Sequence, residues 1–443
     1  MNDLTTIAYC QFKATNLEWI RCIPKHWEIV RIKHGFQTIG SGTTPSSNHD
    51  EFYDGDVPWV NTSELRENVV IFTEKMVTSE ALREFSALKL YPKGSVLFAM
   101  YGATIGRVAI LGIAATVNQA VCVLADPERF SGRYVFYGFQ ATRSVLEAIA
   151  TGGGQPNLNA EKVREYKLPC PPIEEQIAIA DYLDRETARI DALVAEKQRM
   201  LALLEEKRAA LISRAVTRGL NPNAPLKPSG LDWLGDIPAH WETPPIYARF
   251  EVQLGKMLDE KKIKGTHLVP YLRNVDVQWG AINVSSLPEM DFDDDSRIRY
   301  SLKTGDILVC EGGEIGRTAI WGGGLNECYY QKALHRLRSL RGADDASFFV
   351  FVMRCLVDRS VFSSQATAAT IQHLPAEKLR NVRYPSPPFL EQRAITSFLN
   401  HETARIDAIR VEIYTSIRLL KERRAALITA AVTGQISPEE MTA

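Results

Sequence analysis

The sequence predicts an α+β protein built as a pseudo-two-fold internal repeat, in which two globular mixed α/β domains are joined and separated by two long, antiparallel coiled-coil helices. The first observation is a duplicated segment. PPIEEQIAIADYLDRETARIDAL, which begins at Pro171, returns at Pro387 as PPFLEQRAITSFLNHETARIDAI. The second is LEWIRCIPKHWE, which begins at Leu17 and returns at Leu231 as LDWLGDIPAHWE. Similarity at a fixed separation of about half the chain indicates one duplicated structural unit.

The expected order of elements follows from these anchors. A segment at 1–20 without a strong helical signal precedes the first globular domain, 21–170, and the second domain covers 231–386. Both domains contain many glycines, aromatic residues and short β-branched runs such as SVLFAMYG and RTAIW, which favour strands and turns. The stretch NPNAPLKPSG at 221–230 contains three prolines and is expected to be a linker. Residues 437–443 form a C-terminal tail.

The regions 171–220 and 387–436 are expected to be long helices. Beyond their opening Pro-Pro pairs they carry apolar residues at the alternating three- and four-residue spacing of a coiled-coil stripe. A basic residue interrupts the stripe at the matching positions Arg208 and Arg424. At about 1.5 Å per residue, each helix would be roughly 65–70 Å long. For any single residue on these helices, a plain spacer role is the alternative to a functional one.

The composition indicates an ordinary globular protein of the cytoplasm. Its 52 basic and 53 acidic side chains leave a formal charge of −1, so the total charge alone does not point to nucleic acid. The seven cysteines are scattered singly without a C-x-x-C pair, which fits a reducing compartment and no zinc site. The N-terminus lacks a signal-peptide pattern, and no apolar run is long enough to span a membrane.

Candidate catalytic motifs are incomplete. Ser386–Phe389 reads S-P-P-F and matches the tetrad of adenine-N6 methyltransferases, but the repeated site Cys170–Ile173 reads C-P-P-I. No glycine-rich loop for S-adenosylmethionine or for nucleotide phosphates is present, and Glu260 begins a lone E-x-K. His26 and His240 belong to the repeated I-P-x-H-W segment, where packing with tryptophan is the expected role. We therefore predict no catalytic residue, no metal site and no cofactor in this chain.

The repeated motifs resemble those of the specificity subunits of Type I restriction-modification systems. The resemblance is carried by NLEWIRCIPKHWEIVRIK and GLDWLGDIPAHWE, and by P-P-x-x-E-Q at Pro171–Gln176 and Pro387–Gln392. E-T-A-R-I-D at Glu186–Asp191 and Glu402–Asp407, and GDILVCEGGEIGRTAI at Gly305–Ile320, extend it over nearly the whole chain.

The resemblance implies two target recognition domains that each read one half of a split, asymmetric site in double-stranded DNA. The helices would set the spacer between the half-sites and dock two modification subunits. Those subunits bind S-adenosylmethionine and methylate adenine, while restriction subunits add ATP- and Mg-dependent translocation and cleavage of phage DNA. The chain itself would be a non-catalytic DNA-binding component without a membrane partner.

The candidate DNA-contacting residues lie in polar loops of both domains. A major groove is read by side chains such as Arg, Lys, Asn and Gln, whereas small hydroxyl residues and glycines allow close approach to phosphates. In the first domain the candidates are Thr43, Thr44, Ser46, Ser47, Asn61, Tyr101, Arg107, Gly153, Gln155, Asn157 and Asn159. In the second they are Lys256, Arg273, Asn274, Glu311, Arg317, Gln331, Lys332, Gln365, Thr370 and Gln372. Arg107 and Arg317 recur in the shared pattern G-x-x-I-G-R-x-A-I, so a framework role is favoured for them.

A protein adaptor that never touches DNA is the alternative function. Such a chain would carry two similar domains on a coiled-coil rod and bind two copies of a protein partner, and the near-neutral charge supports it. A symmetric adaptor should keep its two distal faces alike, whereas divergent loops suit an asymmetric DNA site. The loops diverge between the repeats, which favours the DNA-binding interpretation.

Overall fold

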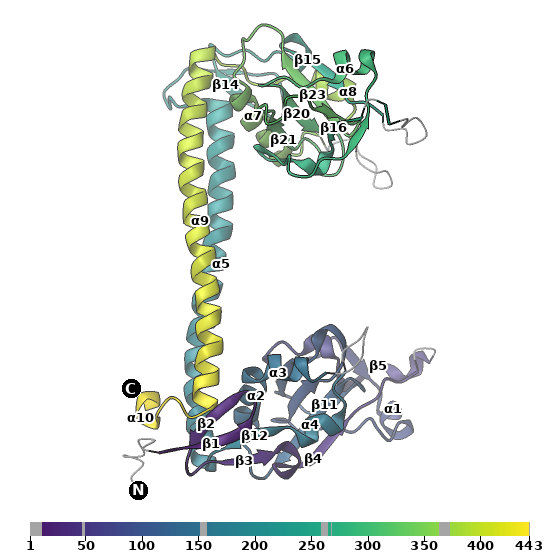
Figure 1. The fold of residues 1–443 in the computed structure, drawn as a ribbon, viewed down its shortest axis with the longest axis vertical. Helices are drawn as coiled ribbons and strands as arrows, with labels where there is room; N and C mark the ends of the chain where they lie inside the picture. The colour runs from purple at the N-terminus through teal and green to yellow at the C-terminus, as the bar shows by residue number, and fades with distance from the viewer. Residues whose placement is uncertain are drawn as a thin grey trace. The chain divides into compact units, whose positions relative to one another are not determined.

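The structure, a computed structural model, divides the chain into two compact units (Figure 1). Unit 1 comprises Met1–Lys197 and Tyr414–Ala443, and unit 2 comprises Gln198–Ile413. The residues that the structure describes are 11–46, 49–150, 157–257, 265–266, 268–362 and 373–442.

Unit 1 contains a five-stranded sheet and a three-stranded sheet. The five-stranded sheet has the order β4 (Phe36–Ser41), β11 (Val121–Pro127), β8 (Val96–Ala99), β9 (Val108–Leu111) and β6 (Asn68–Val70). The three-stranded sheet has the order β10 (Thr116–Val117), β5 (Tyr53–Val60) and β7 (Lys75–Val77), and β12 (Lys167–Cys170) pairs with β3 (Glu28–Arg31). The short helices are α1 (Ser79–Glu84), α2 (Gly132–Ala141), α3 (Arg143–Ala148), α4 (Ala160–Glu165) and α10 (Pro438–Thr442).

Strand β8 is buried on both faces, which explains its unbroken apolar sequence. Val96 and Phe98 belong to the core that includes helix α2, whereas Leu97 and Ala99 belong to a second core around Val60. Successive side chains of a strand point to opposite faces, so each face needs its own apolar partners.

Unit 2 repeats this plan. One sheet has the order β15 (Phe250–Leu254), β23 (Leu334–Ser339), β20 (Ile307–Cys310) and β21 (Thr318–Ile320). The others are β19 (Glu289–Asp291), β16 (Leu268–Leu272) and β22 (Tyr329–Tyr330), and the pair β17 (Val277–Gln278) and β18 (Ala281–Ile282). The helices are α6 (Asp294–Tyr300), α7 (Ala346–Asp358) and α8 (Ala376–Asn381). As in β8, alternate residues of β20 enter two cores, Ile307 beside α7 and Leu308 beside Leu272.

The two long helices expected from the apolar stripe are α5 (Ile173–Arg218) and α9 (Phe389–Val432). Within unit 2, Glu205 Oε2 lies 3.5 Å from Arg410 Nη1, and Arg208 Nη2 lies 3.7 Å from Asp407 Oδ2. Residue numbers rise along α5 while those of their partners fall along α9, so the helices run antiparallel in this unit. The arginine that interrupts the stripe is therefore an ion-pair partner for the facing helix.

The equivalent pair in unit 1 joins Arg424 Nε to Asp191 Oδ1 at 3.0 Å. Arg208 and Asp191 belong to the first repeat, and each is paired with a residue of the second. The two ion pairs are thus the same contact made reciprocally, as the pseudo-two-fold repeat requires.

The repeat extends further towards the N-terminus of each half than the sequence indicated. The segment assigned to 1–20 contains β1 (Phe12–Leu17), which pairs with β2 (Ile20–Pro24). The stretch 221–230, expected to be a linker, contains β13 (Leu226–Pro228), which pairs with β14 (Asp236–Pro238). Its prolines suggested irregular structure, but β13 has a single partner strand and so tolerates them. The other domain boundaries stay predictions.

Within the described part of the chain, no helix is long and apolar enough to cross a membrane. The same residues contain no group of three or more His, Cys, Asp or Glu side chains able to hold a metal ion.

Candidate nucleic-acid interface

Each unit carries a pair of parallel strands whose ends create a polar edge. In unit 1, β10 lies parallel to β5, and the Asn118 N–H that follows β10 donates to the Val60 carbonyl at 3.0 Å. In unit 2, β22 lies parallel to β16, and the Gln331 N–H donates to the Leu272 carbonyl at 3.1 Å. The backbone leaves both strand pairs in the same way, so the residues that follow occupy matching positions.

The residue after each first parallel strand begins a one-turn helix with the same backbone bond. The Asn61 N–H donates to Glu64 Oε2 at 2.7 Å, and the Arg273 N–H donates to Asp276 Oδ2 at 2.8 Å. These carboxylates cap Thr62–Glu64 and Asn274–Asp276. Asn61 and Arg273 are thus the same position filled by different side chains.

The unit 1 edge brings predicted candidates together with two residues that the sequence did not suggest. The Thr44 hydroxyl donates to Gln119 Oε1, and Asn118 Nδ2 donates to Asn61 Oδ1 at 3.2 Å. Trp59 Nε1 donates to the Thr43 carbonyl at 3.2 Å and holds this loop against the strand. Among these described residues, the side chains that bond to one another at the edge are neutral amides and hydroxyls, beside the Glu64 carboxylate that caps Thr62–Glu64.

A glycine allows the loop after the first sheet strand to approach the edge closely in both units. A Cβ placed on Gly42 would lie 1.6 Å from the Val117 carbonyl oxygen, and one on Gly255 would lie 2.2 Å from the Gln331 carbonyl oxygen. Any larger residue would push Thr43 or Lys256 away from the parallel strands.

The unit 2 edge is basic where the unit 1 edge is neutral. The Lys332 N–H donates to the Lys256 carbonyl at 2.8 Å, which places two lysines beside Gln331. Lys256 Nζ donates to the Asp291 carbonyl at 2.7 Å and lies 4.7 Å from the Phe292 ring centroid. Lys332 is exposed, and its ammonium group makes no hydrogen bond or ion pair with another described residue.

The charge of Arg273 is compensated within the protein. Its Nε and Nη2 donate to the two carboxylate oxygens of the buried Asp276 at 2.9 and 2.8 Å, and these bonds raise the pKa of Arg273. Such a bidentate ion pair holds the guanidinium in one orientation. Arg273 therefore contributes less free positive charge to the edge than its residue type suggests.

A second group of candidates adjoins each edge. Tyr101 forms an isolated antiparallel bridge with Asn157. In unit 2, the Glu311 carbonyl accepts from the Leu374 N–H at 2.8 Å, and Asn274 Nδ2 donates to the Gly312 carbonyl at 3.2 Å.

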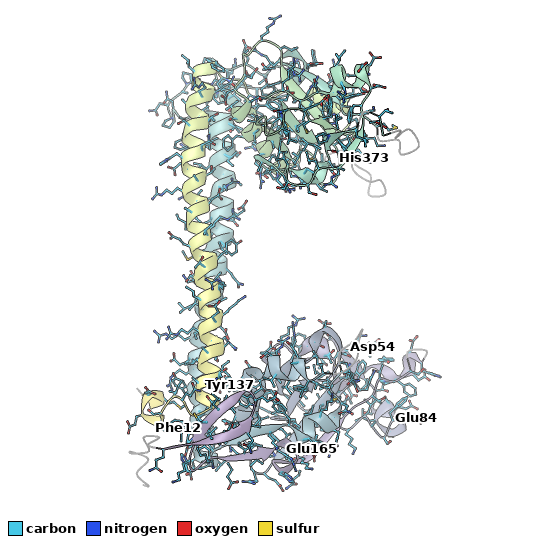
Figure 2. All side chains as sticks on the ribbon, viewed as in Figure 1. Phe12, Asp54, Glu84, Tyr137, Glu165 and His373 are labelled. Atoms are coloured by element: carbon cyan, nitrogen blue, oxygen red, sulfur yellow. The ribbon has the colours of Figure 1, made fainter. Side chains whose placement is uncertain are left out.

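The segment at Leu158 in unit 1 and the segment at Leu374 in unit 2 contact their edges at equivalent positions. His373 is labelled in Figure 2. A Cβ placed on Gly312 would lie 3.5 Å from its Nδ1 atom. Just as the Leu374 N–H donates to Glu311, the Leu158 N–H donates to the Met100 carbonyl at 2.9 Å. Glu311 is thus structurally equivalent to Met100.

Two candidates, Asn159 and Arg317, make local framework contacts, and a third, Arg107, is half-buried. Asn159 accepts the Lys162 N–H at 2.9 Å and caps helix α4. Arg317 donates to the Asn274 carbonyl at 2.8 Å and to Glu314 Oε2 at 3.2 Å, and its framework role stays a prediction. Arg107 is half-buried, and its Nε is covered without a hydrogen-bond partner among the described residues.

The remaining candidates divide into one exposed residue and several that lie outside the described residues. Ser46 is exposed at the end of the loop that carries Thr43 and Thr44. Outside the described residues are Ser47, Gly153, Gln155, Gln365, Thr370 and Gln372, together with Glu260 of the lone E-x-K. For all the candidates, contact with DNA stays a prediction.

Alignment of the two repeats at this edge would have revealed Asn118 and Gln119. The sequence VNQAVCVL of unit 1 stands where unit 2 has YQKALHRL, so Asn118 matches Gln331 and Gln119 matches Lys332. The signal is weak because only two letters are shared, an alanine and the final leucine.

The P-P-x-x-E-Q motifs attach each long helix to the globular part of its unit. Gln176 is fully buried, and its Oε1 accepts from the Ser131 N–H at 2.7 Å, at the start of α2. Gln392 Oε1 accepts from the Asp345 N–H at 2.8 Å, at the start of α7. Glu391 of the second motif accepts from His240 at 2.7 Å, which gives that histidine a structural role.

The S-P-P-F tetrad is part of the same junction. Ser386 is buried, its hydroxyl donates to Asp344 Oδ1 at 3.1 Å, and its N–H donates to the Glu242 carbonyl at 2.9 Å. The Pro387 carbonyl accepts from Gln392 Nε2 at 2.9 Å. These bonds hold the tetrad in place at the start of α9.

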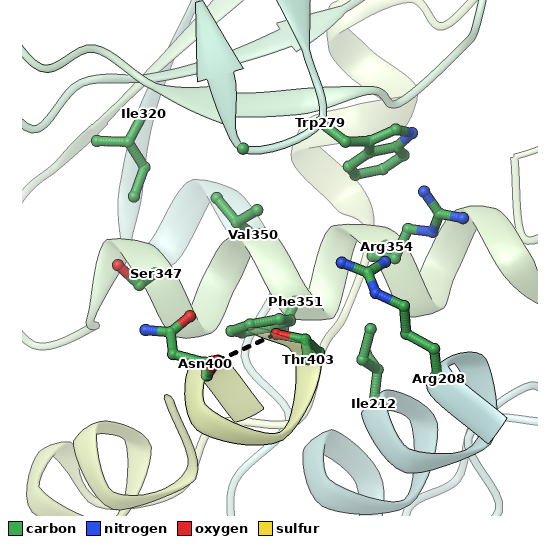
Figure 3. Close-up of a pocket in the computed structure, with 11 residues that line it drawn as sticks. Arg208, Ile212, Trp279, Ile320, Ser347, Val350, Phe351, Arg354, Asn400 and Thr403 are labelled. Carbon is green, nitrogen blue, oxygen red and sulfur yellow. Dashed lines mark hydrogen bonds between the residues drawn. The ribbon is translucent and has the colours of Figure 1, made fainter. Parts of the chain in front are cut away.

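A pocket of about 260 Å³ lies within unit 2 between α7 and the two long helices (Figure 3). Arg354 lies over the Trp279 ring at 4.9 Å and Arg208 lines the same pocket. The Thr403 hydroxyl donates to the Asn400 carbonyl at 3.4 Å. None of the predicted DNA-contacting residues that the structure describes lines this pocket.

Comparisons with a family model and with curated proteins both find similarity to Type I restriction specificity sequences. Residues 24–201 match the family model of the Type I restriction modification DNA specificity domain. The chain is 25% identical over 447 residues to the Type I restriction enzyme MjaIX specificity subunit of Methanocaldococcus jannaschii, covering 97% of this chain and 98% of that protein.

Two solved structures share the fold. A chain described under "Structural basis underlying complex assembly and conformational transition of the type I R-M system" is 17% identical with a TM-score of 0.73, over 93% of this chain and 99% of that one. The HsdS subunit from Thermoanaerobacter tengcongensis is 17% identical with a TM-score of 0.56, over 93% and 98%.

Proposed function

We propose, on the premise that this chain belongs to the Type I restriction-modification specificity subunits, that each of its units reads one half of a bipartite, asymmetric DNA site. Subunits of this family are non-catalytic DNA-binding components of a defence system, and the catalytic activity lies in partner subunits. The finer assignments below are our proposals for this chain.

The observation that supports this function most directly is the contrast between the two polar edges. Their backbones follow the same course, with parallel strands, a capped one-turn helix and a close-approach glycine in each. Their side chains differ, since Asn118 and Gln119 in unit 1 correspond to Gln331 and Lys332 in unit 2. A constant frame with different side chains is suited to reading two different sequences. An adaptor for two identical protein partners would need matching side chains.

The partners would be double-stranded DNA, two modification subunits and, in the full complex, restriction subunits that translocate DNA. Large apolar side chains are exposed at repeated positions of the long helices, namely Ile173 with Phe389 and Leu203 with Leu419. Equivalent exposed positions on α5 and α9 support the docking of two copies of one partner. The lengths of α5 and α9 would set the spacer between the half-sites.

Cofactor chemistry would belong to the partners. The modification subunits would bind S-adenosylmethionine, and the restriction subunits would bind ATP and Mg²⁺. The complex would act in the cytoplasm, where it meets both the host chromosome and incoming DNA.

The experiment is co-expression of this chain with its modification subunits in a methylation-free host, followed by sequencing of methylated adenines. We expect one bipartite motif, which disappears when this chain is omitted. Replacement of residues 237–385 with the corresponding domain of a relative should change one half of the motif only. Methylation without a bipartite motif, or a motif that persists without this chain, would contradict the proposal. If the assembled complex does not bind DNA, the alternative function as a protein adaptor is favoured.

A further inference from the structure

We propose that Gln119 of unit 1 and Lys332 of unit 2 are the specificity-determining residues of their edges, each reading a base in the major groove. This inference rests on the proposed function, because it names the side chains through which the two edges would read DNA. Gln119 and Lys332 occupy the same place in two copies of one frame.

The backbone is fixed both before and after Gln119 and Lys332, and in the same way in both units. Gln119 and Lys332 each stand second after the parallel strands β10 and β22. The residue that follows each is an alanine with a matching bond: Ala120 accepts from the Met100 N–H at 2.9 Å, and Ala333 accepts from the Glu311 N–H at 2.9 Å. The side chain between these anchor points is exposed in both units. A rigid backbone with an exposed side chain meets the geometric requirement for base reading.

Three neighbouring polar side chains, those of Asn118, Arg273 and Lys256, are already engaged. Asn118 donates to Asn61 and accepts the Ala120 N–H at 3.1 Å, so both ends of its amide have partners. Arg273 is held by Asp276, and Lys256 donates to the Asp291 carbonyl. These residues position the edge, whereas Gln119 and Lys332 remain available.

The Thr44 hydroxyl orients the Gln119 amide without exhausting it. Oε1 accepts from Thr44 through one lone pair, which leaves the second lone pair and both Nε2 hydrogens for a ligand. An amide that can accept and donate together matches the N6 and N7 edge of adenine. The Lys332 ammonium only donates, which matches the O6 and N7 acceptors of guanine. We therefore expect an adenine opposite Gln119 in one half-site and a guanine opposite Lys332 in the other.

The test uses the complete complex of this chain with its modification subunits, and it measures the methylated motif across a randomised DNA library. Gln119→Ala should relax one position of one half-site, lowering discrimination there roughly 5- to 140-fold. Lys332→Ala should do the same in the other half-site only. Gln119→Lys introduces the unit 2 side chain into the unit 1 frame and should change that position from adenine towards guanine.

The matched control is Lys303→Ala. Lys303 is also an exposed lysine of unit 2, but it precedes β20, whereas the edge lies where β20 ends. Its removal should leave the motif unchanged. A uniform loss of methylation by Lys332→Ala with an unchanged motif would identify a phosphate contact and overturn the inference.

The other outcomes are also decisive. An unchanged motif with Gln119→Ala would overturn the inference for unit 1. Loss of all methylation by both Gln119→Ala and Gln119→Lys, in complexes that assemble and melt normally, would also overturn it, because the other positions should stay readable. If the unaltered complex yields no bipartite motif, the proposed function fails instead.

Discussion

Removal of the Gln176 side chain should loosen the junction between helix α5 and the globular part of unit 1. Gln176 is fully buried and makes three short bonds: it accepts from the Ser131 N–H at 2.7 Å and donates to the carbonyls of Pro171 at 2.8 Å and Arg129 at 2.9 Å. At about 1 kcal/mol for each lost bond, with a further cost for the unpaired polar groups and the cavity, Gln176→Ala should lower the free energy of unfolding by about 3–5 kcal/mol. In a unit of this size, the melting temperature should fall by about 6–20 °C.

Hydrogen exchange and thermal melting together test this expectation. Peptides from α2 should exchange faster in Gln176→Ala, while peptides from α7 should keep their protection. Gln392→Ala should produce the mirrored result, because its Oε1 accepts the N–H at the start of α7. Gln198→Ala removes an exposed glutamine from the same helix α5 and should change stability by no more than about 0.5 kcal/mol. Our reasoning would be refuted if Gln176→Ala matched Gln198→Ala in both measurements.

Three further predictions concern pH, thiol reactivity and helix length. Burial lowers the pKa of His335, so the unfolded chain binds the proton first as the pH falls, and unit 2 should lose stability below about pH 6.5. His335→Cys copies the equivalent Cys122 and should make the stability measured by urea titration depend less on pH. An unchanged pH dependence in this variant would count against the prediction. Iodoacetamide followed by mass spectrometry should label the exposed Cys22 and spare Cys122, because burial raises the pKa of the Cys122 thiol to about 12; rapid labelling of both would argue against this. Four residues inserted after Glu205 and four before Arg410 should lengthen each helix by about 6 Å. The spacer should then grow by about one to two base pairs, with both half-sites retained. New half-site bases with the old spacer would contradict the proposal that helix length sets the spacer.

The long helices were predictable because their signals are local. The apolar stripe, the Pro-Pro starts and the absence of interior proline are all properties of neighbouring residues. The residues that break the stripe, Arg208 and Arg424, needed the structure to be understood, because their aspartate partners belong to the other repeat.

The edges were predictable only in part because they depend on contacts between distant segments. Gly42 meets Val117, and Thr44 meets Gln119, across a long stretch of chain, and no local pattern shows either approach. For the same reason β13 was expected to be a linker, since its pairing with β14 is not visible in its prolines. The residues with local signatures, such as the cap Asn159, were identified as polar loop positions but not as caps.

The reciprocal ion pairs suggest how such a protein could arise. A chain of one repeat contains both an arginine equivalent to Arg208 and an aspartate equivalent to Asp191. Two copies of that chain would satisfy each other as an antiparallel homodimer, and such a dimer would present two identical edges suited to a palindrome. Fusion of two copies of the gene would keep both ion pairs within one polypeptide. If each edge reads one half-site, as we propose, a later substitution in one edge would alter only that half-site, and single mutations would make an asymmetric target accessible.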